Sequence, residues 1–247
     1  IVFMFSTCIA EGNDTVKIPA LMYHSVTEGD SNAIISPDNF RKHLNAMKKD
    51  GFTPVSLEEI VDFVDNGGVL PEKPVLITFD DGYTNNYTEA FPILSEYNFK
   101  ATIFAIVNSV GLDTYKGTLQ KMNSHFDYSQ GKTMIDSGLI SIQSHSYDMH
   151  QWPDFESTLN ARETVLRMQG ESLLDYVKNF EKDFLKSKNL IEAELNNKVI
   201  GFSYPLGKYD AVSDFILRKN GIRVTFSTST GQNYIKKYDK NSLYNLN

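Results

Sequence analysis

The strongest constraint on the fold of this chain is a regular alternation of short apolar runs with longer segments of helical periodicity. Residues 101–107 are almost entirely apolar, as is typical of a buried strand. Strands that alternate with helices pair in parallel through right-handed crossovers. The sequence therefore predicts an α/β fold, either a (β/α) barrel with fewer than eight strands or an open doubly wound sheet. The expected strands are residues 18–23, 74–79, 101–107, 139–143, 198–203 and 222–226, with 243–246 as a candidate seventh.

Capping residues mark where the helices start. Ser36 before Pro37 has the pattern of an N-cap and a first helical residue, and Ser56 with Glu59 forms a capping box. Residues 108–131 are mostly polar and without period, and we expect them to run irregularly over the barrel mouth. The expected helices are residues 36–51, 56–68, 85–97 with Pro92 near the middle, 132–137, 172–195 and 211–220. The buried side of the longest helix is expected to carry Leu173, Val177, Phe180, Phe184 and Ile191.

The first ten residues are apolar, but the run is too short to span a bilayer and no basic leader precedes it. We interpret residues 1–17 as the remnant of a signal peptide or membrane anchor with a short linker. A buried first strand is the alternative for this run. Its cysteine, Cys8, stands in a context that fits a lipoprotein cysteine poorly. Residues 18–247 then form one domain, and we expect a secreted or cell-surface protein that can associate with a membrane through the N-terminal segment.

The formal net charge is −7 and the sequence pI is about 5.3. Nucleic-acid-binding proteins usually carry a basic stripe, so nucleic acid is not an expected partner. This charge also disfavours capture of an anionic polymer, whereas a neutral acetylated glycan is compatible with it. The sequence does not indicate an oligomeric state.

Polar or conformationally special residues follow four of the predicted strands. Parallel α/β folds place function at the C-terminal ends of their strands, so these residues are the candidates for a common site. They are His24 after the first strand, Asp80 and Asp81 after the second, His145 and His150 after the fourth, and Tyr204, Pro205 and Leu206 after the fifth.

Asp80 and Asp81 stand side by side directly after an apolar strand. Successive side chains of a strand point to opposite faces, so both can reach one site only where the strand breaks into a turn. Gly82 supplies that break. One carboxylate can then bind a cation while the other stays free as a base. Taken alone, Asp-Asp-Gly is more often a solvated turn, but the apolar strand before it favours a site.

His145 and His150 are five residues apart. On a helix they would lie about 140° apart around the axis and could not share a ligand, so a shared site requires a loop. Two imidazoles and one carboxylate make a three-ligand metal site with a position open for water or substrate. Each histidine alone, His24 included, is more often a structural or surface residue, but the grouping with Asp81 favours metal.

Together these segments resemble a known family. Thr78–Tyr83, the His145–His150 loop and Tyr204–Gly207 are similar to the three leading motifs of the NodB-type polysaccharide deacetylases, carbohydrate esterase family 4. The five-residue histidine spacing and the early Tyr23-His24 pair most resemble the branch that deacetylates poly-β-1,6-N-acetylglucosamine in biofilm matrix.

The resemblance implies a distorted (β/α)7-type barrel, the NodB homology domain, over residues 18–247. It implies a secreted, metal-dependent hydrolase that removes N-acetyl groups from N-acetylglucosamine-containing polysaccharide. Asp80 matches the general base, the backbone N–H of Leu206 matches an oxyanion donor, and His24 is a candidate general acid. The metal ligands that it implies, usually for Zn²⁺ and in some members for Co²⁺ or Ni²⁺, are Asp81, His145 and His150.

The chain departs from the family pattern in two places. Many relatives carry an arginine that holds the base just before the Tyr-Pro segment, and residues 200–203 contain none. Either another cation takes this role, with Arg162 as our candidate, or Asp80 is less restrained. Relatives also show a further C-terminal motif that is not found before Asn247, so either the domain is truncated or the branch does not need it.

Aromatic residues near the motifs are candidates for contact with sugar, although each would also fit packing around the loops. Leu206 stands where most relatives have an aromatic residue, which removes stacking there but leaves a backbone role. The candidate substrate contacts are Tyr83, Tyr147, Trp152, Tyr204 and Pro205.

Two other functions stay open. One is a deacetylase of peptidoglycan or chitin oligomers, or a xylan esterase. The residues of the sugar subsites would distinguish these enzymes from the polysaccharide deacetylase described above. The other is a glycan-binding module without turnover, against which Asp80 argues because a pure binder needs no base. The chain has neither a Gly-x-Ser-x-Gly nucleophile elbow nor a phosphate loop, which argues against an unrelated hydrolase.

Overall fold

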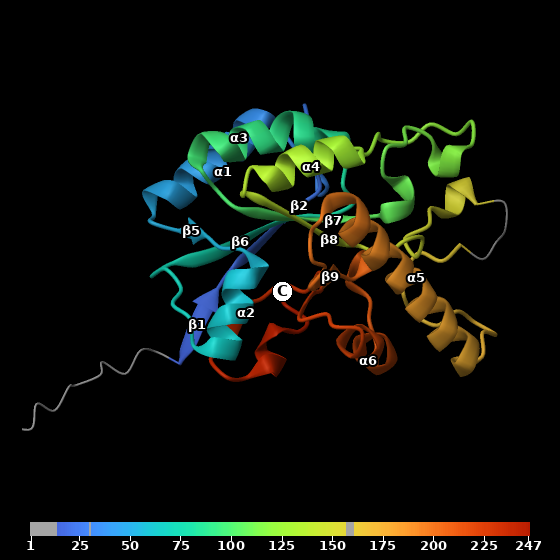
Figure 1. Ribbon diagram of the computed structural model, residues 1–247. Helices are drawn as coiled ribbons and strands as arrows, with labels where there is room; N and C mark the ends of the chain where they lie inside the picture. The colour runs from blue at the N-terminus through green and yellow to red at the C-terminus, as the bar shows by residue number, and fades with distance from the viewer. Residues whose placement is uncertain (1–13, 30, 157–160) are drawn as a thin grey trace, which may run out of the picture.

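One parallel sheet of seven strands organises the chain, whose computed structural model describes residues 14–29, 31–156 and 161–247 (Figure 1). The strands are β2 (Ala20–Tyr23), β5 (Thr53–Pro54), β6 (Pro74–Phe79), β7 (Ala101–Ala105), β8 (Ile140–Ser144), β9 (Gly201–Ser203) and β10 (Val224–Phe226). Across the sheet the order is β10–β9–β8–β7–β6–β2, with β5 paired to the start of β6. Every pairing is parallel, and the sheet curls into a partial barrel. The predicted α/β barrel-type fold is confirmed.

The expected seventh strand was wrong. Residues 240–243 form a 3-10 helix, η6 (Lys240–Leu243), and Leu246 makes an isolated bridge to Phe226. The seventh strand is instead β5, which has two residues and so leaves almost no periodic signal in the sequence.

Residues 18–23 were expected as one strand, but Pro19 divides them. β1 (Thr15–Ile18) pairs antiparallel with β11 (Asn233–Lys236), whereas β2 joins the main sheet. Proline has no N–H to continue a ladder, which explains the change of partner. The folded part therefore begins before the expected boundary at residue 18, and residues 1–13 of the interpreted signal remnant lie outside the described residues. Nearby, β3 (Ser25–Val26) and β4 (Ile34–Ile35) form another parallel pair.

The caps read from the sequence start the expected helices. Ser36 accepts a hydrogen bond from Asn39 N, and the capping box of Ser56 and Glu59 is formed. One helix starts at residue 128 rather than 132, because Asp127 caps it. The helices are α1 (Pro37–Lys49), α2 (Leu57–Asn66), the π-helical turn η1 (Asn86–Ala90) that leads into α3 (Phe91–Tyr97), α4 (Tyr128–Asp136), α5 (Leu173–Leu195) and α6 (Ala211–Lys219).

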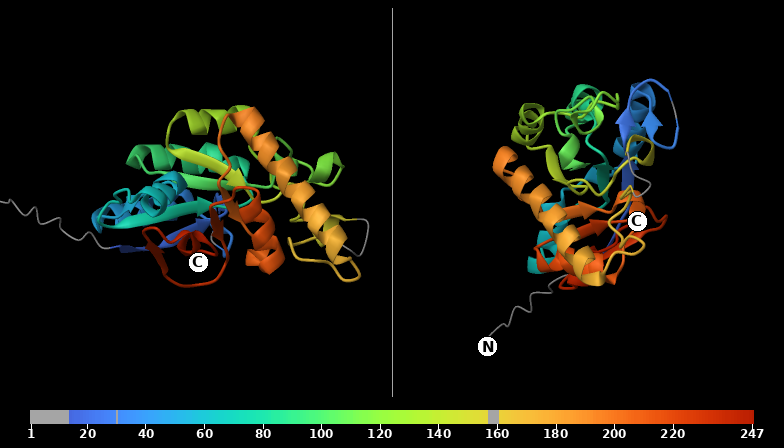
Figure 2. Two further views of the ribbon diagram at one scale, coloured as in Figure 1. Left: turned by 60° about the horizontal axis from the view of Figure 1, so that its bottom comes forward. Right: turned by 90° about the vertical axis from the view of Figure 1, so that its right-hand side faces the viewer.

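Two apolar cores hold the sheet. The larger core lies between the sheet and α1, α3, α4, α5 and α6, and the smaller packs α2, β1 and β11 against the other face. Figure 2 shows α5, the long orange helix, crossing one side of the molecule. Leu173 is 53% exposed, contrary to expectation, because it starts α5 before the buried stripe begins at Tyr176.

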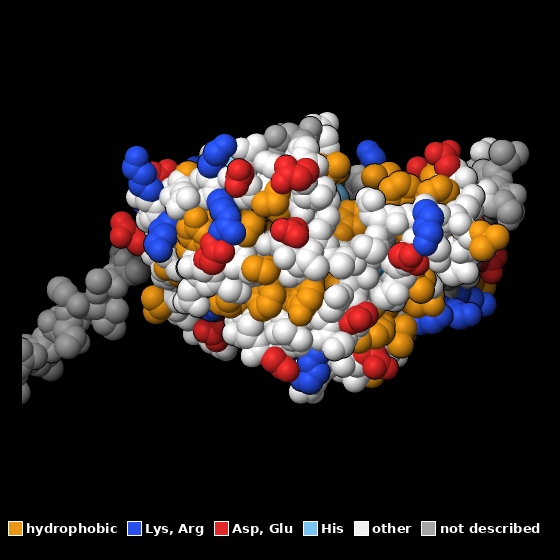
Figure 3. Space-filling model, turned by 90° about the horizontal axis from the view of Figure 1, so that it is seen from above, with side chains coloured by type: hydrophobic (Ala, Val, Ile, Leu, Met, Phe, Trp, Pro, Cys, Tyr) orange, Lys and Arg blue, Asp and Glu red, His pale blue; other side chains and the backbone are white. Residues whose placement is uncertain are grey.

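Acidic and basic side chains are interspersed on the face above α1, α3 and α4 (Figure 3). That face carries no broad field of one sign. No helix within the described ranges is long and apolar enough to cross a membrane.

Candidate metal centre

Asp81 lies in a tight turn directly after β6. Its backbone takes a left-handed φ of 72°, and Gly82 follows with a φ of 83°. A Cβ at Gly82 would lie 3.1 Å from Phe126 and 3.2 Å from Ala105, so a side chain here would meet both strain and crowding. This turn lets Asp80 and Asp81 approach one site although they are adjacent in sequence.

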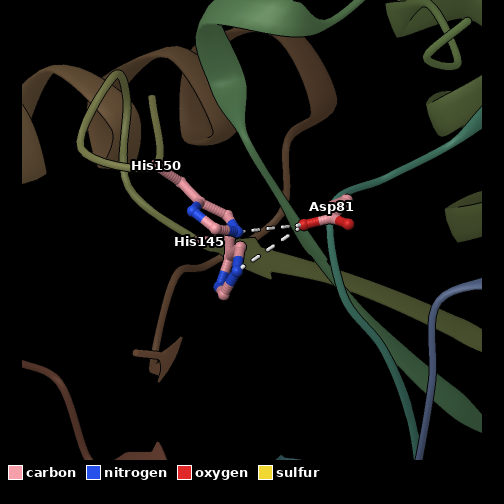
Figure 4. A group of neighbouring side chains, drawn as sticks. All are labelled: Asp81, His145 and His150. Carbon is pink, nitrogen blue, oxygen red and sulfur yellow. Dashed lines mark ion pairs between the residues drawn. The ribbon is translucent and has the colours of Figure 1, made fainter. Parts of the chain in front are cut away.

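His145 and His150 lie in the loop after β8, where Ser146 also takes a positive φ of 75°. Their Nε2 atoms are 3.7 and 3.8 Å from Asp81 Oδ1 (Figure 4). One ligand atom from each of the three residues lies within 4.8 Å of the others. The structure therefore brings together the three expected ligands from β6 and β8, two strands that β7 separates.

The hydrogen bonds of the two imidazoles determine which nitrogen faces Asp81. His145 Nδ1 lies 2.8 Å from the Ser203 carbonyl and His150 Nδ1 lies 3.1 Å from the Glu163 carbonyl. A carbonyl can only accept, so both Nδ1 atoms donate and both Nε2 atoms present lone pairs. Burial lowers the pKa of both histidines, which favours the neutral form that binds metal.

These residues fit a divalent cation. Among the described residues, Asp81 Oδ1 has no hydrogen-bond partner although it is buried, and two imidazole lone pairs face it. Such an arrangement is unfavourable unless a cation is shared between them. Ligands about 2.1 Å from one tetrahedral ion lie roughly 3.4 Å apart, only a few tenths of an ångström less than the distances here.

Asp80 is buried next to this cluster. Its Oδ2 accepts a hydrogen bond of 3.0 Å from Ser203 Oγ on β9. Burial raises the pKa of Asp80 to about 7, while the nearby His24 acts in the opposite direction. Our candidate cation for this carboxylate was wrong, because Arg162 bonds to Glu171 and to a backbone carbonyl instead.

His24 follows β2 beside the turn that carries Asp80, and Leu206 follows the end of β9. The register pairs Tyr23 with Phe79, so the next residues, His24 and Asp80, leave their strands side by side. Leu206 takes a left-handed φ of 54°. Its N–H donates to no group in the described part of the chain, whereas those of Gly207 and Lys208 donate to Tyr204 and Pro205.

Three of the five expected sugar contacts are buried, so their exposure does not support these predictions. Tyr204 is 1% exposed and its hydroxyl donates to Asp214, and Pro205 is buried beside it. Tyr83 is also buried, and its ring packs against His125 at 5.1 Å. Its small exposed area gives no support to stacking on sugar.

The other two expected contacts differ from each other. Lys186 Nζ on α5 covers the Tyr147 ring at 3.7 Å, so this ring faces the helix. Trp152 is 45% exposed and stacks on Phe155, which leaves a face free for a sugar. Trp152 remains the candidate platform.

Asp183 is a residue whose role the sequence did not reveal. This half-buried side chain on α5 accepts the backbone N–H groups of Tyr147 and Asp148, both at 2.8 Å. These two groups lie between His145 and His150, so Asp183 holds the loop that carries both. The one signal in the sequence is an acid directly before Phe184, on a helix whose buried stripe is apolar apart from Ser187.

Comparisons with known proteins agree with this geometry. Residues 67–225 match the family described as polysaccharide deacetylase. The chain is 31% identical over 215 residues to YxkH of Bacillus subtilis (strain 168), which is assigned by name to the polysaccharide deacetylases. It is 25% identical over 205 residues to the poly-beta-1,6-N-acetyl-D-glucosamine N-deacetylase of Escherichia coli (strain K12).

These matches cover 87% and 77% of the chain but only 66% and 30% of the two relatives. Among solved structures, IcaB from Ammonifex degensii superposes with a TM-score of 0.75 at 26% identity. That superposition covers 93% of this chain and 90% of IcaB.

Proposed function

This chain belongs to the polysaccharide deacetylase family, and on that premise we propose that it is a metal-dependent hydrolase that removes N-acetyl groups from N-acetylglucosamine-containing polysaccharide. The observation that carries the proposal is the cluster of Asp81, His145 and His150 with the buried Asp80 beside it. A glycan-binding module without turnover would need the metal cluster at most, and would have no use for the buried carboxylate of Asp80. A carboxylate whose pKa is raised to about 7 is suited to moving a proton near neutral pH.

For the substrate we propose poly-β-1,6-N-acetylglucosamine, because the Escherichia coli relative is named for its N-deacetylation. The net charge of −7 suits a neutral polymer better than an anionic one. We also propose that the protein acts outside the cytoplasm, as the apolar residues 1–10 suggested. Fractionation of the producing cells tests that location.

Each group has one task in the proposed reaction. A divalent cation, with Zn²⁺ as the first candidate, would polarise the acetamide carbonyl and acidify the attacking water. Asp80 takes the proton of that water on Oδ1, since Ser203 occupies Oδ2. The Leu206 N–H stabilises the negative oxygen of the tetrahedral intermediate. His24 gives a proton to the departing amine, which is a very poor leaving group without one.

Acetate release from soluble oligomers, with and without chelator and added Zn²⁺ or Co²⁺, tests this function. The oligomers should include β-1,6-linked N-acetylglucosamine, chitin, peptidoglycan fragments and acetylated xylan. We expect Asp80→Asn to bind metal as the wild type does but to release acetate about 10²- to 10⁴-fold more slowly. Asp136→Asn is the matched control, because Asp136 is an exposed partner of Lys132 on α4.

Near-normal turnover by Asp80→Asn would refute the base assignment. Release from chitin, peptidoglycan or xylan alone would redirect the substrate. No release from any of them by metal-loaded protein would favour a glycan-binding module.

A further inference from the structure

Residues 107–126, which we call the strap, form most of the connection from β7 to α4. Asn108 N donates to the Tyr147 carbonyl at 3.0 Å, which fixes the start of the strap on the metal loop, residues 145–150. Further along the strap, Lys116 lies in a short 3-10 turn with a left-handed φ of 49°. A residue other than glycine keeps this conformation only where its surroundings hold it there, so we expect Lys116 to be firmly held.

The ammonium group of Lys116 joins two separate parts of the chain. It lies 2.9 Å from Asp148 Oδ2, within the metal loop, and 2.5 Å from Glu156 Oε1, four residues after Trp152. All three charged side chains are partly buried. Isolated exposed ion pairs contribute little to stability, but one cation shared by two carboxylates in a partly buried network holds its partners in place.

Trp152 and Phe155 form an aromatic platform shortly after the metal loop. Their rings stack at 5.8 Å, and Phe155 also packs against the Tyr115 ring at 5.3 Å. The Tyr115 hydroxyl donates to Glu156 Oε1 at 2.5 Å, the same oxygen that contacts Lys116. The orientation of the platform therefore depends on the Glu156 carboxylate and on the cation that neutralises it.

The other carboxylate belongs to a loop that is also fixed by other contacts. Asp148 Oδ1 accepts a hydrogen bond from Asn108 Nδ2 at 3.3 Å, and the backbone N–H of Asp148 donates to Asp183 at 2.8 Å. The metal loop should therefore keep its place when Lys116 is replaced, whereas the platform loses its link to the loop. Without the ammonium group, two carboxylates that contacted one nitrogen would face each other and repel, which would displace Glu156 and the platform.

We propose that Lys116 is a positioning residue that fixes the distance between the aromatic platform and the metal loop, and so sets where a sugar stacked on Trp152 presents its acetamide to Asp80. The inference rests on the proposed function and deepens it. A sugar can still stack on a displaced platform, but its acetamide then misses the position that the reaction requires. Such a displacement lowers turnover more than it weakens binding.

The test compares Lys116→Met with Lys121→Met, because Lys121 also lies in the strap but pairs with Asp113 on the exposed surface. On the oligomer that the wild type deacetylates, we expect Lys116→Met to lose about 10- to 100-fold in kcat and to keep KM within about threefold. Zn²⁺ affinity should equal that of the wild type, because Asp183 still holds the metal loop. Lys116→Arg, which keeps the cation, should restore kcat.

Fluorescence gives a second readout that does not depend on turnover. Trp152 is the only tryptophan in the sequence, so quenching of tryptophan emission by acrylamide reports on the platform. At a temperature at which every variant is folded, we expect acrylamide to quench metal-free Lys116→Met more strongly than Lys121→Met. Quenching of Lys116→Arg should match that of the wild type.

The proposal is overturned if kcat and Trp152 quenching are the same in Lys116→Met and Lys121→Met, or if only KM changes. It is also overturned if Zn²⁺ affinity falls together with kcat, or if Lys116→Arg is as impaired as Lys116→Met. If the wild type releases no acetate but Lys116→Met exposes Trp152, the proposed reaction fails and the placement of the platform by Lys116 stands. If the wild type releases acetate and Lys116→Met behaves as Lys121→Met does, the reverse holds.

Discussion

The most informative perturbation of the metal loop is Asp183→Asn. The carboxylate accepts one N–H on each oxygen, from Tyr147 and from Asp148. Asparagine has the same shape but one acceptor oxygen, so its amide NH₂ would face one of these N–H donors. The change therefore removes one hydrogen bond and places the asparagine NH₂ group against a backbone N–H group. It alters no atom of the proposed metal ligands.

The expected size follows from these two contacts. A hydrogen bond to a charged group contributes about 1.5–3 kcal/mol. If the strain stays in the loop between His145 and His150, metal affinity weakens about 10- to 100-fold, which is the range for groups that orient ligands. If the loop relaxes in the free protein, the same energy lowers the melting temperature by roughly 3–10 °C.

The assay is competition for Zn²⁺ against a chromophoric chelator, together with thermal unfolding of the metal-free protein. Glu181→Gln is the matched control, because Glu181 lies two residues earlier on α5 and bonds to Lys219 and Asn220 away from the loop. A Zn²⁺ affinity and a metal-free melting temperature both equal to those of Glu181→Gln would refute the reasoning.

Three further outcomes are expected. Zn²⁺ at 100 times its dissociation constant should raise the melting temperature by about 5–10 °C, since binding to the native state adds about 2.7 kcal/mol; an equal melting temperature in chelator would contradict the metal site. Leu206→Gly should keep acetate release within about twofold and unfold no more easily, because only the backbone N–H acts and glycine relieves the positive φ; a large loss of turnover would assign a role to the side chain. Partial burial raises the pKa of Asp183 from 3.8 to about 6. The stabilisation that Asp183 gives the metal-free protein is therefore fully present below pH 4 and is lost as the pH rises through 6. The free energy of unfolding, measured against pH, should show this loss in the wild type and lack it in Asp183→Asn.

Local sequence was enough to predict the strand ends and the residues of the cluster. An apolar run followed by Asp80, Asp81 and Gly82 specifies a buried strand and a turn whatever the rest of the chain does. The same holds for the strand before His145. Parallel strands end at one edge of a sheet. The order of the elements therefore also predicted that these residues would lie close together. The metal and its chemistry remain predictions for the assays above.

Contacts between distant segments were beyond the sequence. Ser203 is hydrogen-bonded to Asp80, 123 residues earlier in the chain. Arg162, which was expected to hold Asp80, bonds instead to Glu171, nine residues further on. Tyr204 follows the same strand end as Leu206, yet one is buried and the other half exposed. Sequence pattern indicates which residues reach an edge, but not which of them the neighbouring elements cover.

The sequence by itself thus determined the fold class and the four central residues Asp80, Asp81, His145 and His150, because periodicity, caps and strand ends are local properties. Tertiary structure alone decided how the histidines present their Nε2 atoms, that Asp183 holds their loop, and that Lys116 joins this loop to the segment after Trp152. These features depend on carbonyls, helices and side chains that approach from remote parts of the chain. Their positions are set by packing of the whole domain, which no local pattern records.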